Sequence, residues 1–498
     1  MKKVVIIGGG VGGLATACIM AKKGYDVSLY EKNEKLGGRM NIFTKKGFTF
    51  DMGPSWYLMP DIFENFYNLM GEKIEDHLNL VKLSPSYRIF FKGDESVDMY
   101  SDLKKDIPTL EKLEKGSGEN LKKYLNRAEK QYNISKESFI YKNYNSIFDF
   151  INIRTMIQGT QLSVFSKMED YVSSYFSNDK VKKIIQYPLV FLGSSPYTTP
   201  ALYSIMNHID FNMGVFYPMG GMYEIAKSLI NIAEKNGAKL YTSTPVSQIV
   251  VKQGEVKGVE LSGGKVIKAD IVISNGDIHH TETQLLGRKY RQYKQEYWEK
   301  RVLAPSALIM YLGVKKQFLS LQHHNLLFSK DWEKNFEEIF DDPQWPTDPS
   351  LYVCAPSKTD PSVAPKNHEN LFVLVPIASG LNYTEDSLDE YADKTLKLME
   401  DEMGLEGLRE NLIYKRLYSV KDFKEDYNSY KGTALGLAHT ITQTAIFRPN
   451  NVSSKVKNLY YVGANTNPGI GVPICLISAE MVYKRVANIK SDGALTEL

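Results

Sequence analysis

Residues 2–30 combine two short apolar runs with a glycine-rich turn and an apolar helical stretch. Val4–Ile7 is apolar and Val27–Tyr30 is apolar apart from Ser28, which predicts strands buried on both faces of a parallel sheet. Leu14–Lys23 lies between them and predicts a helix that Gly24 ends. We therefore expect a strand, a helix and a second strand at the start of an α/β domain.

The middle of the chain shows a second group of apolar positions with strand periodicity. A helix is expected up to about Asn236, where Gly237 ends it. The strands expected after it are Leu240–Tyr241, Val246–Val251, Val256–Leu261 and Ile271–Ser274. We interpret this segment as a return to the first domain. Asn275 would then follow a strand at the sheet edge where ligands bind in open α/β sheets.

The C-terminal part repeats the pattern of a strand, a glycine turn and a helix. Asn458–Ala464 predicts a buried strand running into a turn, and Gly469–Pro473 leads to a helix from Ile474. Backbone N–H groups at a helix start attract anions. We therefore expect both ends of the chain to build one binding site.

The remaining segments predict a second domain. The elements expected there are strands at Val302–Val314, Leu351–Ala355 and Phe372–Ile377 and helices at Leu103–Asn143, Ala201–Met206 and Thr384–Met403. The fold class is α/β, with a Rossmann-like nucleotide-binding domain assembled from residues 1–105, 214–300 and 440–498. Residues 106–213 and 301–439 are expected to form an α+β substrate domain with a mixed or antiparallel sheet and helices.

Three glycines directly after the first predicted strand match the spacing G-x-G-x-x-G. Gly8 permits the tight turn, Gly10 lets the backbone approach a pyrophosphate, and Gly13 lets the helix pack close to the strand. Glu31 follows the second strand, where an acid is expected to bond the adenosine ribose hydroxyls and to disfavour a 2′-phosphate. A plain glycine-rich turn is the alternative, but the strand and helix around it favour a dinucleotide site.

Composition narrows the function further. The chain has 498 residues and a formal charge of +3, which gives no case for nucleic-acid binding. Its three cysteines, Cys18, Cys354 and Cys475, lack metal-site spacing and predict a reducing compartment. The start of the chain does not read as a signal peptide, and no apolar run is long enough to span a bilayer. Any membrane contact is therefore expected to be peripheral.

The residues after Glu31 resemble a second fingerprint of flavoproteins. Leu36-Gly37-Gly38-Arg39 is similar to the motif found in the amine oxidase and carotenoid desaturase group, where glycines give access to the diphosphate and arginine supplies positive charge. A simple turn is the alternative for the glycines. The resemblance implies FAD rather than NAD. The residues predicted to bind this cofactor are Gly8, Gly10, Gly13, Glu31, Lys32, Gly38, Arg39, Gly53, Pro54, Ser55, Val246, Asn275, Gly463, Ala464, Gly471, Val472 and Pro473.

Longer motifs extend this resemblance from end to end. They are Phe48–Pro54, Gly214–Met222, Leu435–Pro449 and Asn458–Pro473. Together with the N-terminal glycines they resemble the bacterial carotenoid desaturases that act on phytoene and dehydrosqualene. This implies an FAD enzyme that removes hydrogen from a long lipophilic polyene, in peripheral contact with lipid on the cytoplasmic side of the membrane. The length of the polyene and the oligomeric state stay open.

The dehydrogenation that the resemblance implies also requires a group that accepts a proton. Asp149 and Arg154 are polar residues in the apolar stretch around residues 144–157, so they are candidate acid/base and orienting groups. An exposed surface position is the alternative for each. His439 is a candidate near the flavin or the polyene, and it could equally hold local backbone. The pairs His279-His280 and His323-His324 are expected in solvated loops, and no metal site is predicted.

Three other functions are compatible with these motifs. A carotenoid oxidase or ketolase shares the fold and oxidises end groups. A flavin amine oxidase should show an amine-recognising aromatic cage or a C-terminal membrane helix, whereas this chain ends in a short polar tail. A flavin-binding or lipid-carrying protein without enzymatic activity is the third. The motifs favour desaturation.

Overall fold

The computed structural model describes residues 1–144 and 166–498 of the chain. Its N-terminal strand lies at the centre of a five-stranded sheet with the order β19-β13-β1-β2-β9. The strands are β1 (Lys3–Ile7), β2 (Asp26–Tyr30), β9 (Lys239–Tyr241), β13 (Ile271–Ser274) and β19 (Leu459–Tyr461). Every neighbouring pair runs parallel. The prediction that distant parts of the chain build one parallel sheet is confirmed.

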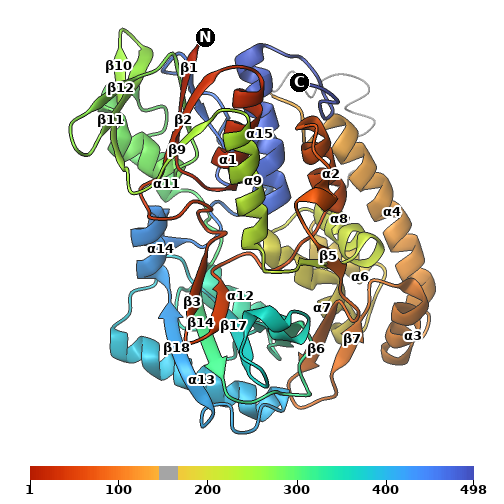
Figure 1. Ribbon diagram of the computed structural model, residues 1–498. Helices are drawn as coiled ribbons and strands as arrows, with labels where there is room; N and C mark the ends of the chain where they lie inside the picture. Colours follow the sequence, from red (N-terminus) through yellow and green to blue (C-terminus); the bar gives the residue numbers. More distant parts are fainter. Residues whose placement is uncertain (145–165) are drawn as a thin grey trace.

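Both faces of this sheet are covered, because successive side chains of a strand point to opposite sides. Val4 and Ile6 pack against a layer of helices. These helices are α1 (Val11–Lys22), α2 (Pro60–Leu69), α9 (Tyr223–Lys235) and α15 (Val472–Ala487). Val5 and Ile7 face an antiparallel sheet of three strands. Its strands are β10 (Val246–Lys252), β11 (Glu255–Leu261) and β12 (Val266–Lys268). Figure 1 shows α1, α9 and α15 next to one another, to the right of strands β1, β2 and β9.

A mixed seven-stranded sheet forms the core of the other half of the molecule. Its order is β18-β14-β17-β16-β15-β6-β7, and only β15 and β6 run parallel. The strands are β6 (Tyr87–Phe91), β7 (Val97–Met99), β14 (Ser306–Val314), β15 (His324–Phe328), β16 (Leu351–Cys354), β17 (Glu369–Ile377) and β18 (Leu412–Tyr418). Two further pairs of antiparallel strands form separate small sheets. They are β3 (Ile42–Lys45) with β4 (Phe48–Asp51) and β5 (Leu80–Lys82) with β8 (Phe216–Pro218).

Helices cover this second sheet unevenly. They are α3 (Leu103–Leu113), α4 (Ser117–Ser138), α6 (Met168–Ser173), α7 (Asp179–Gln186), α8 (Ile205–His208), α12 (Trp332–Phe340), α13 (Glu385–Met403) and α14 (Val420–Tyr427). Two short helices, α10 (Ile278–His280) and α11 (Gln295–Glu299), precede β14. Leu371, Val373 and Val375 of β17 pack in one core with α13. The alternate residues of β17 face a cavity instead.

Strands β6 and β7 differ from the sequence interpretation, which grouped residues up to 105 with the nucleotide-binding domain. In the structure they extend the seven-stranded sheet, because Leu326 of β15 pairs with Ile89 of β6. Because β15 lies far from β6 along the chain, the short apolar sequence of β6 does not indicate which sheet this strand joins. The domain boundaries themselves stay a prediction.

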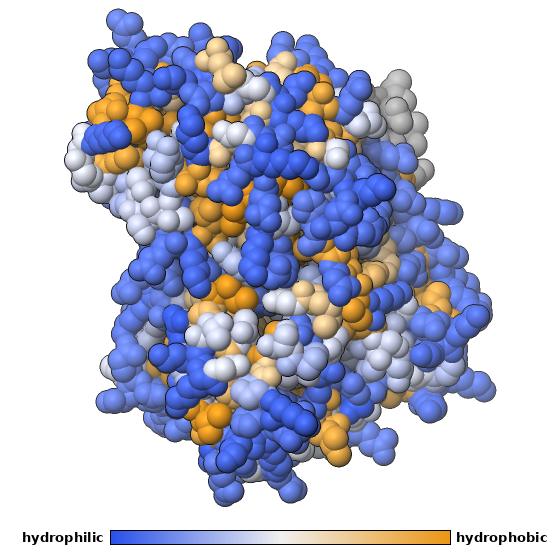
Figure 2. Space-filling model, viewed as in Figure 1, coloured by the Kyte–Doolittle hydropathy of each residue, from blue (hydrophilic) through white to orange (hydrophobic). Residues whose placement is uncertain are grey.

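The outer surface is mainly hydrophilic in the view of Figure 2, with separate hydrophobic patches. One patch lies over the three-stranded sheet, where Val266 is 52% exposed. No helix in the part of the chain that the structure describes is both long and apolar enough to cross a bilayer.

Asp210 is buried beside α8 and gives the fold a pH dependence. Its Oδ2 accepts hydrogen bonds from the hydroxyls of Tyr87 (2.7 Å) and Tyr187 (3.0 Å). Burial raises the pKa of Asp210 from 3.8 to about 7. The folded chain therefore keeps this proton up to about pH 7, whereas the unfolded chain releases it near its ordinary pKa.

We expect the free energy of unfolding to fall as the pH rises from 4 through 7, by at most about 4 kcal/mol from this group. Asp210→Asn cannot ionise and should flatten this dependence, which urea unfolding at a series of pH values measures. An equally steep loss of stability in the variant would assign the effect to other groups.

Candidate cofactor and substrate site

One large cavity begins at the glycine turns of the parallel sheet and continues to the seven-stranded sheet. Its volume is about 1210 Å³. Gly8, Glu31 and Gly471 line one part, while Leu374 and Pro376 of β17 line another. Pockets for one small ligand rarely exceed about 1,000 Å³. The cavity therefore has room for a cofactor and a second, apolar ligand.

The first glycine turn opens the N-terminus of α1 toward this cavity. Gly8 has a φ of +93°, which favours glycine, and Gly10 precedes the helix without a side-chain cap. The first turn of α1 contains no acid, so its N–H groups are left for an anionic ligand. Gly13 does not line the cavity: a Cβ there would lie 2.2 Å from the Gly8 carbonyl oxygen, so it serves close packing.

Glu31 holds the glycine turn and faces the cavity. Its Oε2 accepts from the Gly9 N–H at 2.7 Å, and its Oε1 accepts from the Asn33 N–H at 2.8 Å. Asn275 Nδ2 donates to the Gly8 carbonyl at 3.4 Å, from the end of β13. These bonds fix the position of a buried carboxylate that retains free acceptor capacity for ribose hydroxyls.

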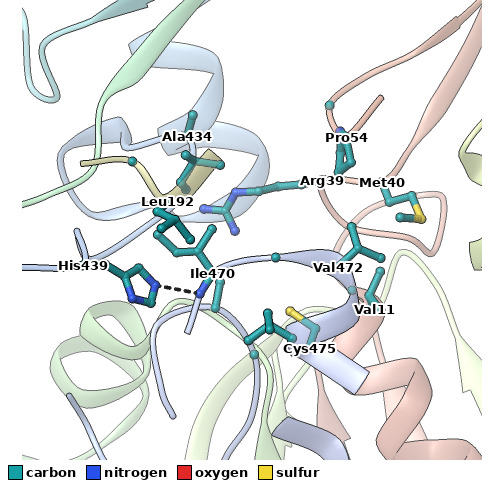
Figure 3. Close-up of a pocket in the computed structure, with 18 of the residues that line it drawn as sticks. Val11, Arg39, Met40, Pro54, Leu192, Ala434, His439, Ile470, Val472 and Cys475 are labelled. Carbon is teal, nitrogen blue, oxygen red and sulfur yellow. Dashed lines mark hydrogen bonds between the residues drawn. The ribbon is translucent and has the colours of Figure 1, made fainter. Parts of the chain in front are cut away.

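Arg39 extends into the cavity from the second fingerprint. Figure 3 shows its guanidinium reaching from the side of Pro54 toward Leu192 and Ala434. Arg39 Nη2 donates to Ser429 Oγ at 3.3 Å, while its Nε is buried without a protein partner in the described residues. A buried unpartnered donor of this kind is suited to a ligand phosphate or carbonyl oxygen.

The other predicted contacts of this segment lie nearby. Gly53 passes so close to Arg39 that a Cβ on it would lie 2.5 Å from the Arg39 carbonyl oxygen. Ser55 Oγ shares a hydrogen bond of 2.8 Å with the Tyr352 hydroxyl. Lys32 lines the cavity and donates from Nζ to the Glu425 carbonyl oxygen.

The C-terminal turn brings a second helix start to the same cavity. Gly471 precedes α15 with a φ of +130° and no side-chain cap, and no acid lies in the first turn. Two helix N-termini and Arg39 therefore converge on one region, which suits the diphosphate of a dinucleotide. The predicted residues that line it are Gly8, Gly10, Glu31, Lys32, Gly38, Arg39, Gly53, Pro54, Ser55, Val246, Asn275, Gly463, Ala464, Gly471, Val472 and Pro473. The donors, the glycine cradle and the acid fit FAD.

His439 lines the cavity, but both of its ring nitrogens are engaged. Nδ1 bonds to the Tyr203 hydroxyl at 2.5 Å, and Nε2 accepts from the Ile470 N–H at 3.2 Å, the bond drawn in Figure 3. Burial, followed by the nearby Arg448, lowers the pKa of His439 well below its ordinary value. A catalytic role stays a prediction. The geometry favours the alternative, a neutral imidazole that positions the turn before α15.

Several lining residues were absent from the sequence predictions. They are Gly12, Pro245, Asp277, His280, Asp426, Tyr427, Ala434, Thr444, Asn467 and Pro468. Ala434 borders the motif Leu435–Pro449, Thr444 lies inside it, and Asn467-Pro468 lies inside Asn458–Pro473, so their motifs carried a signal. Asp426 and Tyr427, by contrast, lie at the end of α14 outside these motifs, and only tertiary packing places them beside the cavity. The candidates Asp149 and Arg154 lie outside the described residues.

The prediction that the paired histidines lie in solvated loops was wrong for both pairs. His279 and His280 belong to the short helix α10 and are partly buried. The second pair, His323 and His324, is buried. They are 3% and 0% exposed, and His324 belongs to β15. Its ring stacks on Trp56 at 4.1 Å, and its Nδ1 bonds to the Tyr352 hydroxyl at 2.7 Å. The apolar residues after His324 continue the strand, which buries the histidine with it. Together with Cys354 they form a cluster whose ligand-type atoms lie within 4.8 Å of one another.

Comparison with known proteins places the chain in a family. Residues 11–486 match the family of flavin-containing amine oxidoreductases. A carotenoid 3,4-desaturase of Haloarcula japonica is 45% identical, over 96% of each chain. A zeta-carotene-forming phytoene desaturase of Myxococcus xanthus is 34% identical, over 97% of this chain and 94% of that one. A 4,4'-diaponeurosporene oxygenase of Staphylococcus haemolyticus is 32% identical, over 97% of each chain.

Solved structures support the fold. A putrescine oxidase bound to putrescine superposes with a TM-score of 0.62 and 14% identity, over 98% of this chain and 99% of that one. The family match and the residues of the cavity together assign FAD as the cofactor. The chain belongs to the flavin-containing amine oxidoreductases and, within them, to the carotenoid desaturase family.

Proposed function

We propose that the protein desaturates an acyclic polyene, with one hydrogen leaving as hydride to bound FAD and the neighbouring one as a proton. The observation that carries this is the continuity of the cavity. The nucleotide-binding turns open directly onto an apolar wall formed by β14 and β17, where Ile309, Leu374 and Pro376 lie. A long hydrocarbon chain can lie along this wall with a C–C bond beside the flavin.

The chain's own residues would orient the polyene and exclude water. Leu374 and Pro376 alternate along β17, so their side chains project from the same face of the strand toward the cavity. Tyr352 and Ser55 are bonded to each other at the junction of the two parts. None of these four side chains carries a charge, so this part of the cavity suits a neutral substrate better than a charged amine.

Oxygenation is the second candidate, because a relative named as an oxygenase covers almost the whole chain. Incubating the flavin-loaded enzyme with C30 and C40 acyclic polyenes distinguishes the two. Desaturation predicts products that absorb at longer wavelength and contain no added oxygen by mass spectrometry. Products with added oxygen, or no product from any polyene, would contradict the proposal.

We further propose that the protein docks on the cytoplasmic face of the cell membrane to collect this lipid-soluble substrate. An apolar patch formed by Val302, Ile441 and Phe447 supports it, with side chains 43%, 37% and 54% exposed. Gln443 holds its two segments together, since its amide donates to and accepts from the Val302 backbone at 2.8 Å. The neighbouring residues Thr444 and Ala445 line the cavity.

Ile441→Ser with Phe447→Ser is therefore expected to weaken liposome binding. Each half-exposed side chain can contribute about 1 kcal/mol of transfer energy, so partitioning should fall roughly tenfold or more. Flotation with phosphatidylglycerol–phosphatidylcholine vesicles measures this, and flavin content should stay unchanged. Leu319→Ser is the control, because Leu319 is 95% exposed and does not line the cavity. A wild-type protein that stays entirely in the aqueous fraction would contradict the proposal.

A further inference from the structure

Helix α12 turns one face toward the apolar part of the cavity. The residues on this face are Trp332, Asn335, Phe336, Ile339 and Phe340, at the spacing of one helical stripe. Asn335 is the only amide in the stripe. The neighbouring wall consists of side chains such as Phe328, Leu351 and Leu374. A primary amide in these apolar surroundings therefore needs a hydrogen-bond partner.

Asn335 has a hydrogen-bond donor without a partner. The side chain is 5% exposed, and its Oδ1 accepts from the Ser350 N–H at 3.4 Å. This bond orients the amide and leaves Nδ2 as the free end. Among the residues that the structure describes, no group bonds to Asn335 Nδ2.

Trp332 supplies a second donor one turn earlier on the same helix face. The residue is 6% exposed, and its indole Nε1–H is also buried without a partner in the described part of the chain. Buried unpartnered donors cost stability, and two of them along one wall point to a ligand that completes them.

The polar groups nearby do not satisfy these donors, because they bond elsewhere. Ser350 Oγ accepts from the Ser329 N–H at 3.0 Å and bonds to Ser329 Oγ at 3.1 Å. Lys183 Nζ is itself a donor and cannot accept; it donates to the Lys330 carbonyl oxygen at 2.8 Å and pairs with Asp179 at 2.9 Å. The wall of α12 thus presents donors without acceptors, so a ligand that completes it must bring an acceptor.

We propose that Asn335 and Trp332 form a subsite that donates hydrogen bonds to an oxygen atom on the substrate. This rests on the proposed desaturation and names its substrate class: a polyene with an oxygenated end, such as a hydroxyl or a carbonyl. The subsite lies in the half of the molecule built around the seven-stranded sheet, apart from the glycine turns (Figure 1). The oxygen would therefore set how far the chain slides along the cavity and which C–C bond reaches the flavin.

The test compares one acyclic C40 polyene with its counterpart that carries a terminal hydroxyl, using the flavin-loaded enzyme. We expect wild-type kcat/KM to favour the hydroxylated polyene on the order of tenfold or more, because the hydrocarbon leaves both donors unpaired. Asn335→Leu should abolish most of this preference. Trp332→Phe keeps an aromatic ring, removes only the N–H donor, and should reduce the preference severalfold.

Phe336→Leu is the matched control, since it lines the same helix face and carries no hydrogen-bonding group. It should change the rates of both substrates by a similar factor. Flavin content of every variant separates misfolding from altered selectivity. Equal use of both polyenes by the wild type would overturn the subsite, and ordered water would then be the partner of the Asn335 and Trp332 donors. The proposed desaturation would be unaffected by this result. Failure to convert either polyene would overturn the proposed function, and the subsite with it.

Discussion

Gly10→Val is expected to yield a folded protein that has lost most of its FAD. A Cβ at Gly10 would lie 2.8 Å from Asn275 Nδ2, and the valine methyl groups would extend into the cradle in front of α1. Crowding of this kind costs about 1–3 kcal/mol, which corresponds to a loss of affinity of roughly five- to 150-fold. Flavin absorbance and the flavin released on denaturation measure the result.

Gly263→Val provides the matched control for this substitution. Gly263 lies in the turn between β11 and β12, and a Cβ built on it has no neighbour within 4 Å. This variant should retain flavin at the wild-type level. A Gly10→Val protein with full flavin content would show that the cofactor lies elsewhere, and unfolding of that variant by circular dichroism would assign the loss to stability instead.

Leu374→Trp is expected to abolish desaturation while leaving FAD bound. Leu374 projects from β17 into the apolar part of the cavity, whereas its neighbours Val373 and Val375 pack into the core on the other face. An indole at this position would occupy the path of the polyene without touching the nucleotide-binding turns. We expect kcat/KM to fall by roughly two orders of magnitude, in line with the effect of small misplacements on reacting groups.

Leu374→Met is the control, because it keeps the volume of the side chain. It should retain most of the activity. A normal rate for Leu374→Trp would place the substrate outside this wall, and a loss of flavin from the variant would show that the two parts of the cavity are not independent.

Much of the fold could be predicted because its strongest signals are local. The run Val4–Ile7, the glycine turn after it and Glu31 lie within one short segment, and the parallel sheet forms as expected. β6 shows the limit. Its register depends on pairing with β15 far along the chain, so its sheet could not be assigned from its own residues.

The site likewise combines residues that lie in recognisable motifs with residues that only tertiary packing brings to the cavity. The predicted glycines and Arg39 lie in motifs and line the cavity, apart from Gly13, which packs behind it. Tyr427 and Ser429, which contact Arg39, come from a segment without such a motif. The amphipathic pattern of Trp332, Phe336 and Ile339 could have indicated α12. That Asn335 would meet an apolar wall depends on the tertiary packing of other elements.

The most direct measurement of the central claim is flavin reduction by a polyene in the absence of oxygen. The purified, FAD-loaded enzyme is mixed anaerobically with an acyclic polyene in vesicles, and the flavin absorbance is followed together with the polyene spectrum. The proposed function predicts loss of flavin absorbance in step with new polyene bands at longer wavelength. A flavin that stays oxidised with every polyene, hydrocarbon or oxygenated, would contradict it.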